Sequence, residues 1–86
     1  MASYEIEISS SAEKQLGKPP RKQQERIVRA VLPLAQEPLP RGSRKLSGYE
    51  DVFRIPVGRY RVLYSISSGK LVIIILKIGQ RREVCR

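Results

Sequence analysis

Three short apolar segments, at residues 52–57, 60–67 and 71–78, are the feature that most limits the folds open to this chain. They are rich in Val, Ile, Tyr and Phe, and short runs of these residue types are typical of β-strands. A Gly-Arg pair at 58–59 and a Ser-Ser-Gly-Lys stretch at 67–70 separate them, and both sequences favour tight turns. The sequence therefore predicts a three-stranded antiparallel meander.

Basic side chains are interspersed along the first two of these segments. Successive side chains of a strand point to opposite faces, so the apolar residues of the first segment share one face and leave Arg54 on the other. By the same alternation we expect Arg54, Arg59 and Arg61 to project from a common outer face. The third segment is apolar at every position from 71 to 76, so we expect a central strand that is covered on both faces.

The amino-terminal part of the chain predicts a strand and a short helix. Residues 4–8 alternate between apolar and charged side chains, which is typical of a half-buried strand. Ser10 and Glu13 have the spacing of a capping box. We therefore predict a short helix over residues 12–17, with Ser9, Ser10 or Ser11 as its N-cap.

A longer helix and a further short strand complete the predicted elements. Apolar residues recur at helical spacing from 21 to about 36, so we predict an amphipathic helix that Pro33 kinks or ends. Residues 43–46 fit a short strand. The order of elements predicts a single α+β domain over residues 1–86, with two N-terminal helices packed on a curved, mainly antiparallel sheet. The helices would cover one face and leave the arginine face open to a ligand.

A strong excess of positive charge indicates an anionic partner. Seventeen Lys and Arg residues stand against eight Asp and Glu residues, which gives a net charge of +9. Such a surface attracts polyanions and replaces their counterions with protein cations. Nucleic acid is therefore the leading partner and an acidic protein the second. A basic surface that binds nothing is the remaining alternative.

The absence of histidine excludes several classes of site. A serine or cysteine nucleophile would lack the neutral-pH base that a hydrolase triad needs. Cys85 is the single cysteine, so we expect no internal disulfide, no metal site and no cofactor. The longest apolar run is too short to span a bilayer, and the first residues lack the features of a signal peptide. We therefore expect a cytoplasmic protein that does not enter the membrane.

The remaining chemistry is that of positive charge held on a rigid sheet. Cleavage of RNA by its own 2′-hydroxyl needs in-line geometry and donors for the charge that builds on the phosphate, and arginines supply such donors. A guanidinium stays charged, so it is a poor proton carrier. General acid–base help would then come from Glu50, Lys45 or Lys77, or from the substrate complex.

The stretch over residues 45–86 resembles the RelE/ParE superfamily of bacterial toxin–antitoxin systems. It contains K-L-x-G, then R-x-x-x-G-x-Y-R-V-x-Y, then a hydrophobic strand that runs into GQRREVCR. For the RelE branch the resemblance implies a ribosome-dependent endoribonuclease that cleaves mRNA in the ribosomal A site and inhibits translation. It also implies a cognate antitoxin, which we expect to be acidic, covering the active face. Operator DNA would be bound only through the complex with the antitoxin.

The resemblance also assigns roles to individual residues. Arg61 corresponds to the family arginine that contacts the scissile phosphate, and Arg81 to the one that stabilises the transition state. Arg54 takes the position of a basic residue that helps to bind phosphate or to move protons. Further RNA contacts are assigned to the residues around these arginines, namely Lys45, Arg59, Arg82 and Cys85.

Two positions depart from the family pattern. Gln80 stands where many members have histidine, and Cys85 stands where a terminal tyrosine is expected to stack on the cut nucleotide. The aromatic platform is therefore missing unless another ring supplies it, the candidates being Tyr49, Tyr60 and Tyr64. These departures keep two alternatives open. One is a ParE-like inhibitor of DNA gyrase, and the other is an inactive member that only binds its antitoxin or DNA.

Overall fold

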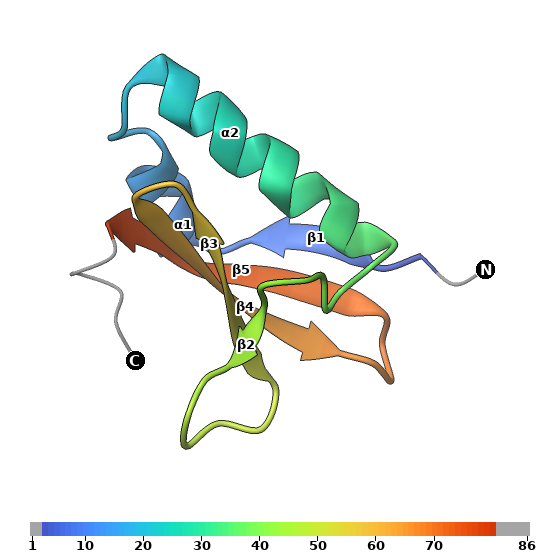
Figure 1. The fold of residues 1–86 in the computed structure, drawn as a ribbon. Helices are drawn as coiled ribbons and strands as arrows, with labels where there is room; N and C mark the ends of the chain where they lie inside the picture. Colours follow the sequence, from blue (N-terminus) through green and yellow to red (C-terminus); the bar gives the residue numbers. More distant parts are fainter. Residues whose placement is uncertain (1–2, 81–86) are drawn as a thin grey trace.

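The computed structural model describes residues 3–80 and contains two helices, a short 3-10 helix and five strands (Figure 1). In chain order these are β1 (Glu5–Ile8), α1 (Ser10–Leu16), α2 (Arg21–Val31), η1 (Leu32–Ala35), β2 (Arg44–Lys45), β3 (Val52–Val57), β4 (Tyr60–Ser67) and β5 (Val72–Gln80). The predicted α+β class is therefore confirmed. Within residues 3–80 no helix is long and apolar enough to cross a membrane.

The five strands form one sheet in the order β1-β5-β4-β3-β2. Strands β3, β4 and β5 are the predicted antiparallel meander, and β2 adds an antiparallel edge. Strand β1 pairs with β5 in parallel, so the first strand of the chain lies beside the last one described. Both helices lie on the same face of the sheet (Figure 1).

The expectation that β5 is covered on both faces is wrong. Ile73 and Ile75 are buried beneath the helices, but Ile74 and Leu76 on the other face are only half-buried. The reason is that α1 and α2 both pack on the face of Ile73, and no helix within residues 3–80 covers the opposite one. The face with no helix remains open to a ligand.

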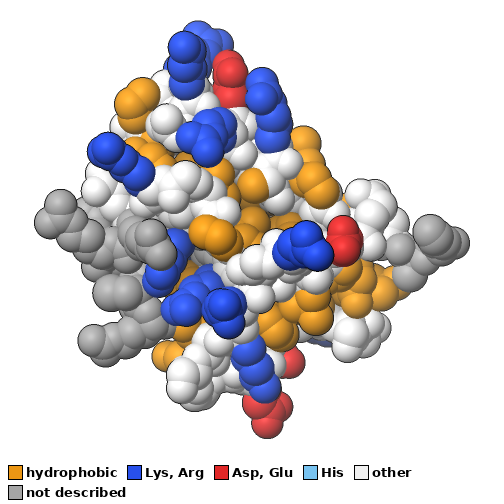
Figure 2. Space-filling model, viewed as in Figure 1, with side chains coloured by type: hydrophobic (Ala, Val, Ile, Leu, Met, Phe, Trp, Pro, Cys, Tyr) orange, Lys and Arg blue, Asp and Glu red, His pale blue; other side chains and the backbone are white. Residues whose placement is uncertain are grey.

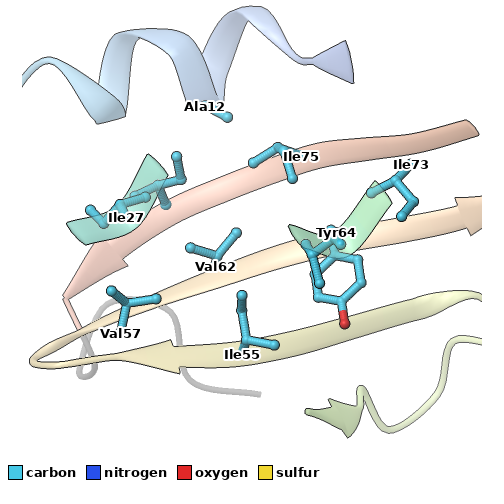
Figure 3. Packing of buried hydrophobic residues seen from close by; sticks show 10 residues of the cluster. Ala12, Ile27, Ile55, Val57, Val62, Tyr64, Ile73 and Ile75 are labelled. Carbon is cyan, nitrogen blue, oxygen red and sulfur yellow. The ribbon is translucent and has the colours of Figure 1, made fainter. Parts of the chain in front are cut away.

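The core lies between the helices and the strands that they cover. Ala12 of α1 and Ile27 of α2 pack over the inward side chains of β4 and β5, among them Val62 and Ile75 (Figure 3). Tyr64 is the largest of the fully buried side chains. Its hydroxyl donates to the carbonyl oxygen of Pro38 at 2.7 Å, so the one polar atom of this side chain is satisfied.

Of the three serines that the sequence offers as N-cap, Ser9 takes this position in α1. The Ser9 hydroxyl oxygen accepts the backbone N–H of Ala12 at 3.1 Å, and the same hydroxyl donates to the carbonyl oxygen of Leu76 at 3.2 Å. Local spacing favoured Ser10 because Glu13 follows it by three residues. The bond to β5 is a tertiary contact, and it selects Ser9 by tying the start of α1 to the sheet.

The long helix ends earlier than the predicted limit near residue 36. Regular α-helix stops at Val31 and continues as the 3-10 turn Leu32–Ala35. Pro33 has no N–H to donate to the carbonyl four residues earlier, so the α-helical ladder is interrupted at this position. The predicted effect of Pro33 is therefore confirmed, while the helix limit was placed too late.

Burial of Tyr64 predicts an alkaline loss of stability. Desolvation raises the pKa of its phenol from 10.0 to about 12. Because the unfolded phenol ionises first, the contribution of Tyr64 is complete below pH 10 and is lost as the pH rises from about 10 to about 12. Urea unfolding across this range should show a steeper decline for the wild type than for Tyr64→Phe. Parallel declines would contradict the assignment.

Candidate nucleic-acid interface

Four cations lie on the face of the sheet that the helices leave open. The strand register places Arg44 opposite Arg54, and it places Leu63 between Arg54 and Lys77. In the next register row, Arg61 lies between Pro56 and Gly79. Adjacent strands are about 4.8 Å apart, so Arg54 and Lys77 are separated by roughly 10 Å across the sheet. We call the set Arg44, Arg54, Arg61 and Lys77 the cationic face.

Acidic side chains are kept away from the cationic face. Glu5 and Glu7 of β1 lie on the same side of the sheet, but they pair with Val72 and Ile74 at the other end of β5. None of the four cations forms an ion pair with another residue in the range 3–80. Figure 2 shows Lys and Arg side chains spread over the visible side of the molecule, with fewer acidic side chains among them. The positive charge is therefore available to an external anion.

A β-bulge turns Lys77 toward the cationic face. Strict alternation from Ile73 and Ile75 would have placed residue 77 in the core. The register instead shifts between Leu63 and Tyr64, so that Leu63 pairs with Lys77, and Ile75 with Tyr64. The extra residue is Leu76, whose carbonyl accepts the Ser9 hydroxyl. The start of α1 therefore helps to hold the bulge that exposes Lys77.

The sequence match decides the family. Residues 6–85, nearly the whole chain, match the family described as the ParE toxin of the type II toxin–antitoxin system parDE. This chain belongs to the RelE/ParE superfamily of toxins. A search of proteins with curated functional descriptions finds no significant match.

Solved structures agree with the fold of this toxin. A chain of the archaeal RelE–RelB complex from Pyrococcus horikoshii OT3 is 33% identical, with 92% of this chain and 96% of that chain covered and a TM-score of 0.82. A chain of the RelBE2 toxin–antitoxin complex from Mycobacterium tuberculosis is 28% identical, with 93% of this chain and 100% of that chain covered and a TM-score of 0.80. A chain of the E. coli RelBE complex is 21% identical, with 91% of this chain and 96% of that chain covered and a TM-score of 0.80. At this identity the likeness shows the fold alone. The family match carries the ParE name and these structures the RelE name, so the two comparisons differ on the branch.

The predicted site residues of the toxin have four different placements. Arg54 and Arg61 share the cationic face, as the alternation predicts. Arg59 lies in the exposed turn between β3 and β4, and not on a strand face. Lys45 pairs with Phe53, whose ring packs on the core, so by register it lies on the side opposite Arg54. The others lie outside the described residues, namely Arg81, Arg82 and Cys85.

The three tyrosines proposed as replacement platforms have different environments. Tyr64 is completely buried, so its ring cannot meet a nucleotide. Tyr49 is 59% exposed in the loop between β2 and β3, which also carries the exposed Glu50. Tyr60 is half-buried at the start of β4, next to Arg61. Only Tyr60 combines accessibility with a position beside the cationic face.

Two members of the cationic face, Arg44 and Lys77, were not placed on it from the sequence. Arg44 belongs to a strand of two residues, which is too short to show an alternating pattern. Lys77 was considered only for proton transfer, because a bulge has no reliable signature in a single sequence. Both positions depend on the pairing of strands that are distant in the chain.

The turn between β3 and β4 sets the register of Arg61 and depends on Gly58. Gly58 has φ +61°, and a Cβ at this position would lie 3.1 Å from the Arg26 guanidinium. We expect Gly58→Ala to lower the free energy of unfolding by about 1–2 kcal/mol, because the left-handed conformation strains a residue with a Cβ. Urea denaturation measures this loss. Gly69→Ala, in the other hairpin turn, is the control and should change stability little, since a Cβ there meets nothing within 4 Å.

The exposed end of the Arg26 side chain can move aside, so steric contact should contribute little to this loss. The free energy of unfolding of the double variant Arg26→Ala/Gly58→Ala should therefore remain as low as that of Gly58→Ala. Full recovery would mean that displacement of Arg26 is the main effect and would contradict the strain argument.

Proposed function

We propose that this toxin is a cytoplasmic, ribosome-dependent endoribonuclease that cleaves mRNA in the A site and so stops translation. The observation that supports the proposal is the pair Arg54 and Arg61 on one open face, flanked by Arg44 and Lys77 and without an acidic partner within residues 3–80. The 33% identical relative is called RelE, which is the branch whose resemblance implies this activity.

The chemistry requires no nucleophile from the protein. The 2′-oxygen attacks the adjacent phosphorus and the bond to the 5′-oxygen breaks, which leaves a 2′,3′-cyclic phosphate and a 5′-hydroxyl. The attacking hydroxyl loses a proton and the leaving oxygen gains one. Arg61 and Arg54 would hold the phosphate and neutralise the charge that builds on it. Arg81 is proposed from its motif position for the same transition state.

Proton transfer is the step with the weakest candidates. Arginines stay protonated, and Glu50 is in the exposed loop between β2 and β3 and not on a strand of the sheet. Lys77 is the group on that face with the best position, since it lies across Leu63 from Arg54. We propose that Lys77 or ribosome-bound water carries the proton.

The test is primer extension on a defined mRNA in a purified translation system, with and without ribosomes. Cuts within A-site codons that need ribosomes would support the proposal. Equal cutting of naked mRNA would contradict the requirement for the ribosome, and the absence of cuts would contradict the ribonuclease.

A second candidate function is inhibition of DNA gyrase, which the match to the ParE family favours. A gyrase supercoiling assay with the same preparation separates the two branches. Inhibition of supercoiling without mRNA cleavage would assign the toxin to the ParE branch. A toxin that does neither but still binds its antitoxin would be an inactive member.

We further propose that an acidic antitoxin segment covers the cationic face. The relatives at 33% and 28% identity were solved as a RelE–RelB complex and as the toxin–antitoxin complex RelBE2. We expect the dissociation constant to rise at least tenfold between low salt and about 0.5 M salt, because exposed charges are screened at high ionic strength. Titration calorimetry measures this change. The double variant Arg54→Ala/Arg61→Ala should show a shallower salt dependence, and an affinity that salt leaves unchanged would contradict an electrostatic clamp.

A further inference from the structure

A pocket at the end of the sheet opens beside the cationic face. Its volume is about 380 Å³, and the α1–α2 loop, the start of β4 and the end of β5 form its walls. Lys77 is part of both the pocket and the cationic face. Gly79, also in the wall, is the strand partner of Arg61. The pocket therefore begins where the row of cations ends.

Gln15 of α1 lines this pocket, and a hydrogen bond fixes the orientation of its amide. Its Oε1 accepts the backbone N–H of Ile78 at 2.7 Å, and an N–H can be accepted only by the oxygen end of the amide. The Nε2 group must therefore occupy the other end, and no residue in the range 3–80 accepts a hydrogen bond from it. A ligand with a carbonyl or ring-nitrogen acceptor would satisfy this donor.

The pocket is held in shape by the α1–α2 loop and by Tyr60. The Gln24 side chain donates to the carbonyl oxygens of Pro19, at 2.8 Å, and Gly17, at 3.3 Å, so the loop is tied to α2. Tyr60 packs against the core while remaining half-exposed, which holds its ring in place. A site that is formed before binding loses little conformational freedom when the ligand arrives.

The side chains of the pocket match the parts of a nucleotide. Lys18 and Lys77 line it, no acidic residue does, and neither lysine has an ion-pair partner within residues 3–80. Two ammonium groups suit a phosphate, the Tyr60 ring suits the flat face of a base, and the Gln15 amide suits an acceptor on the edge of that base. A simple anion would leave the ring unused, and an apolar ligand would leave the lysines unpaired.

We propose that this pocket binds one nucleotide of single-stranded RNA, the one next to the phosphate held by Arg61. The proposal rests on the ribonuclease function proposed above. Tyr60 and Arg61 are adjacent in β4 and point to opposite faces. An RNA strand that folds over the end of the sheet therefore places a phosphate at Arg61 and the neighbouring base at Tyr60. Tyr60 then supplies the aromatic platform that Cys85 does not.

The test is a fluorescence titration of a short RNA that carries 2-aminopurine, whose emission is quenched by stacking. Methyl groups on its 2′-oxygens prevent cleavage, and no ribosome is present. We expect saturable quenching by the wild-type toxin. Tyr60→Leu should abolish the quenching and weaken binding roughly tenfold or more, whereas Tyr60→Phe should preserve both, because stacking needs the ring and not the hydroxyl. Tyr49→Leu is the matched control and should behave as the wild type.

A second variant changes a charge at the rim of the pocket. Its result does not depend on whether a substitution of Tyr60 disturbs the core against which this ring packs. Lys18 is exposed, so Lys18→Glu should fold normally and weaken binding at least tenfold. Absence of quenching by the wild type, quenching that survives Tyr60→Leu, or full affinity in Lys18→Glu would each overturn the pocket. Quenching that depends on Tyr60 in a toxin that cuts no mRNA would keep the pocket and remove the ribonuclease. Cleavage of mRNA together with quenching that does not depend on Tyr60 would keep the ribonuclease and remove the pocket.

Discussion

Replacing Arg61 by alanine is expected to lower the rate of A-site cleavage by about two orders of magnitude. Arg61 lies on the cationic face between Pro56 and Gly79, with no acidic partner within residues 3–80. A preorganised donor to charge that develops in a transition state contributes roughly 100- to 1000-fold in rate. Single-turnover cleavage of mRNA on saturated ribosomes measures the chemical step without a contribution from binding.

Two further variants make the Arg61 result specific. Arg61→Lys keeps the charge but loses the bidentate geometry of the guanidinium, so an intermediate loss of about tenfold is expected. Lys70→Ala removes one positive charge in the β4–β5 turn, at the other end of β4, and should leave the rate within a factor of two to three. If Lys70→Ala and Arg61→Ala were equally slow, net charge and not position would control the rate.

Replacing Tyr64 by alanine is expected to lower the free energy of unfolding by about 3–5 kcal/mol. Tyr64 has no exposed surface, and its hydroxyl satisfies the carbonyl of Pro38. The substitution therefore leaves both a cavity and an unpaired acceptor. Since domains of this kind have total stabilities of about 5–15 kcal/mol, the variant should be close to unfolding at physiological temperature. Urea denaturation followed by circular dichroism at low temperature gives the value.

The same chain offers a control for the loss of a tyrosine ring. Tyr49 is 59% exposed, so Tyr49→Ala should change stability by no more than about 0.5 kcal/mol. A loss below about 1.5 kcal/mol for Tyr64→Ala would mean that the helices collapse onto the sheet and fill the cavity. The core would then be less rigid than its packing indicates.

The meander could be predicted from sequence because its signals are local. Alternation along 52–57 and 60–67 fixes which side chains face inward, and Gly58 marks the turn between them. The parallel pairing of β1 with β5 had no such signal, since its residues are more than sixty positions apart in the chain. The choice among Ser9, Ser10 and Ser11 as the N-cap of α1 stayed open for the same reason, because the Ser9 hydroxyl also bonds to distant Leu76.

The candidate site shows the same division between local and distant information. Arg54 and Arg61 were found because each has apolar neighbours that define the other face of its own strand. Lys77 required knowledge of the bulge, and Gln15 required knowledge that α1 packs on the end of β5. Side chains that a single strand orients can be read from sequence, whereas a pocket between three segments becomes visible only once they are assembled.

The position of β5 has a consequence for the order in which the toxin becomes active. This strand lies between β1 and β4, yet it is the last described strand to be synthesised. Until it is available, β1 has no strand to pair with and α1 has no surface to pack on. Contacts between such distant segments form late in folding. A nascent toxin therefore has no complete cationic face while its own ribosome is still translating β5, because Lys77 and the strand partner of Arg61 belong to this strand.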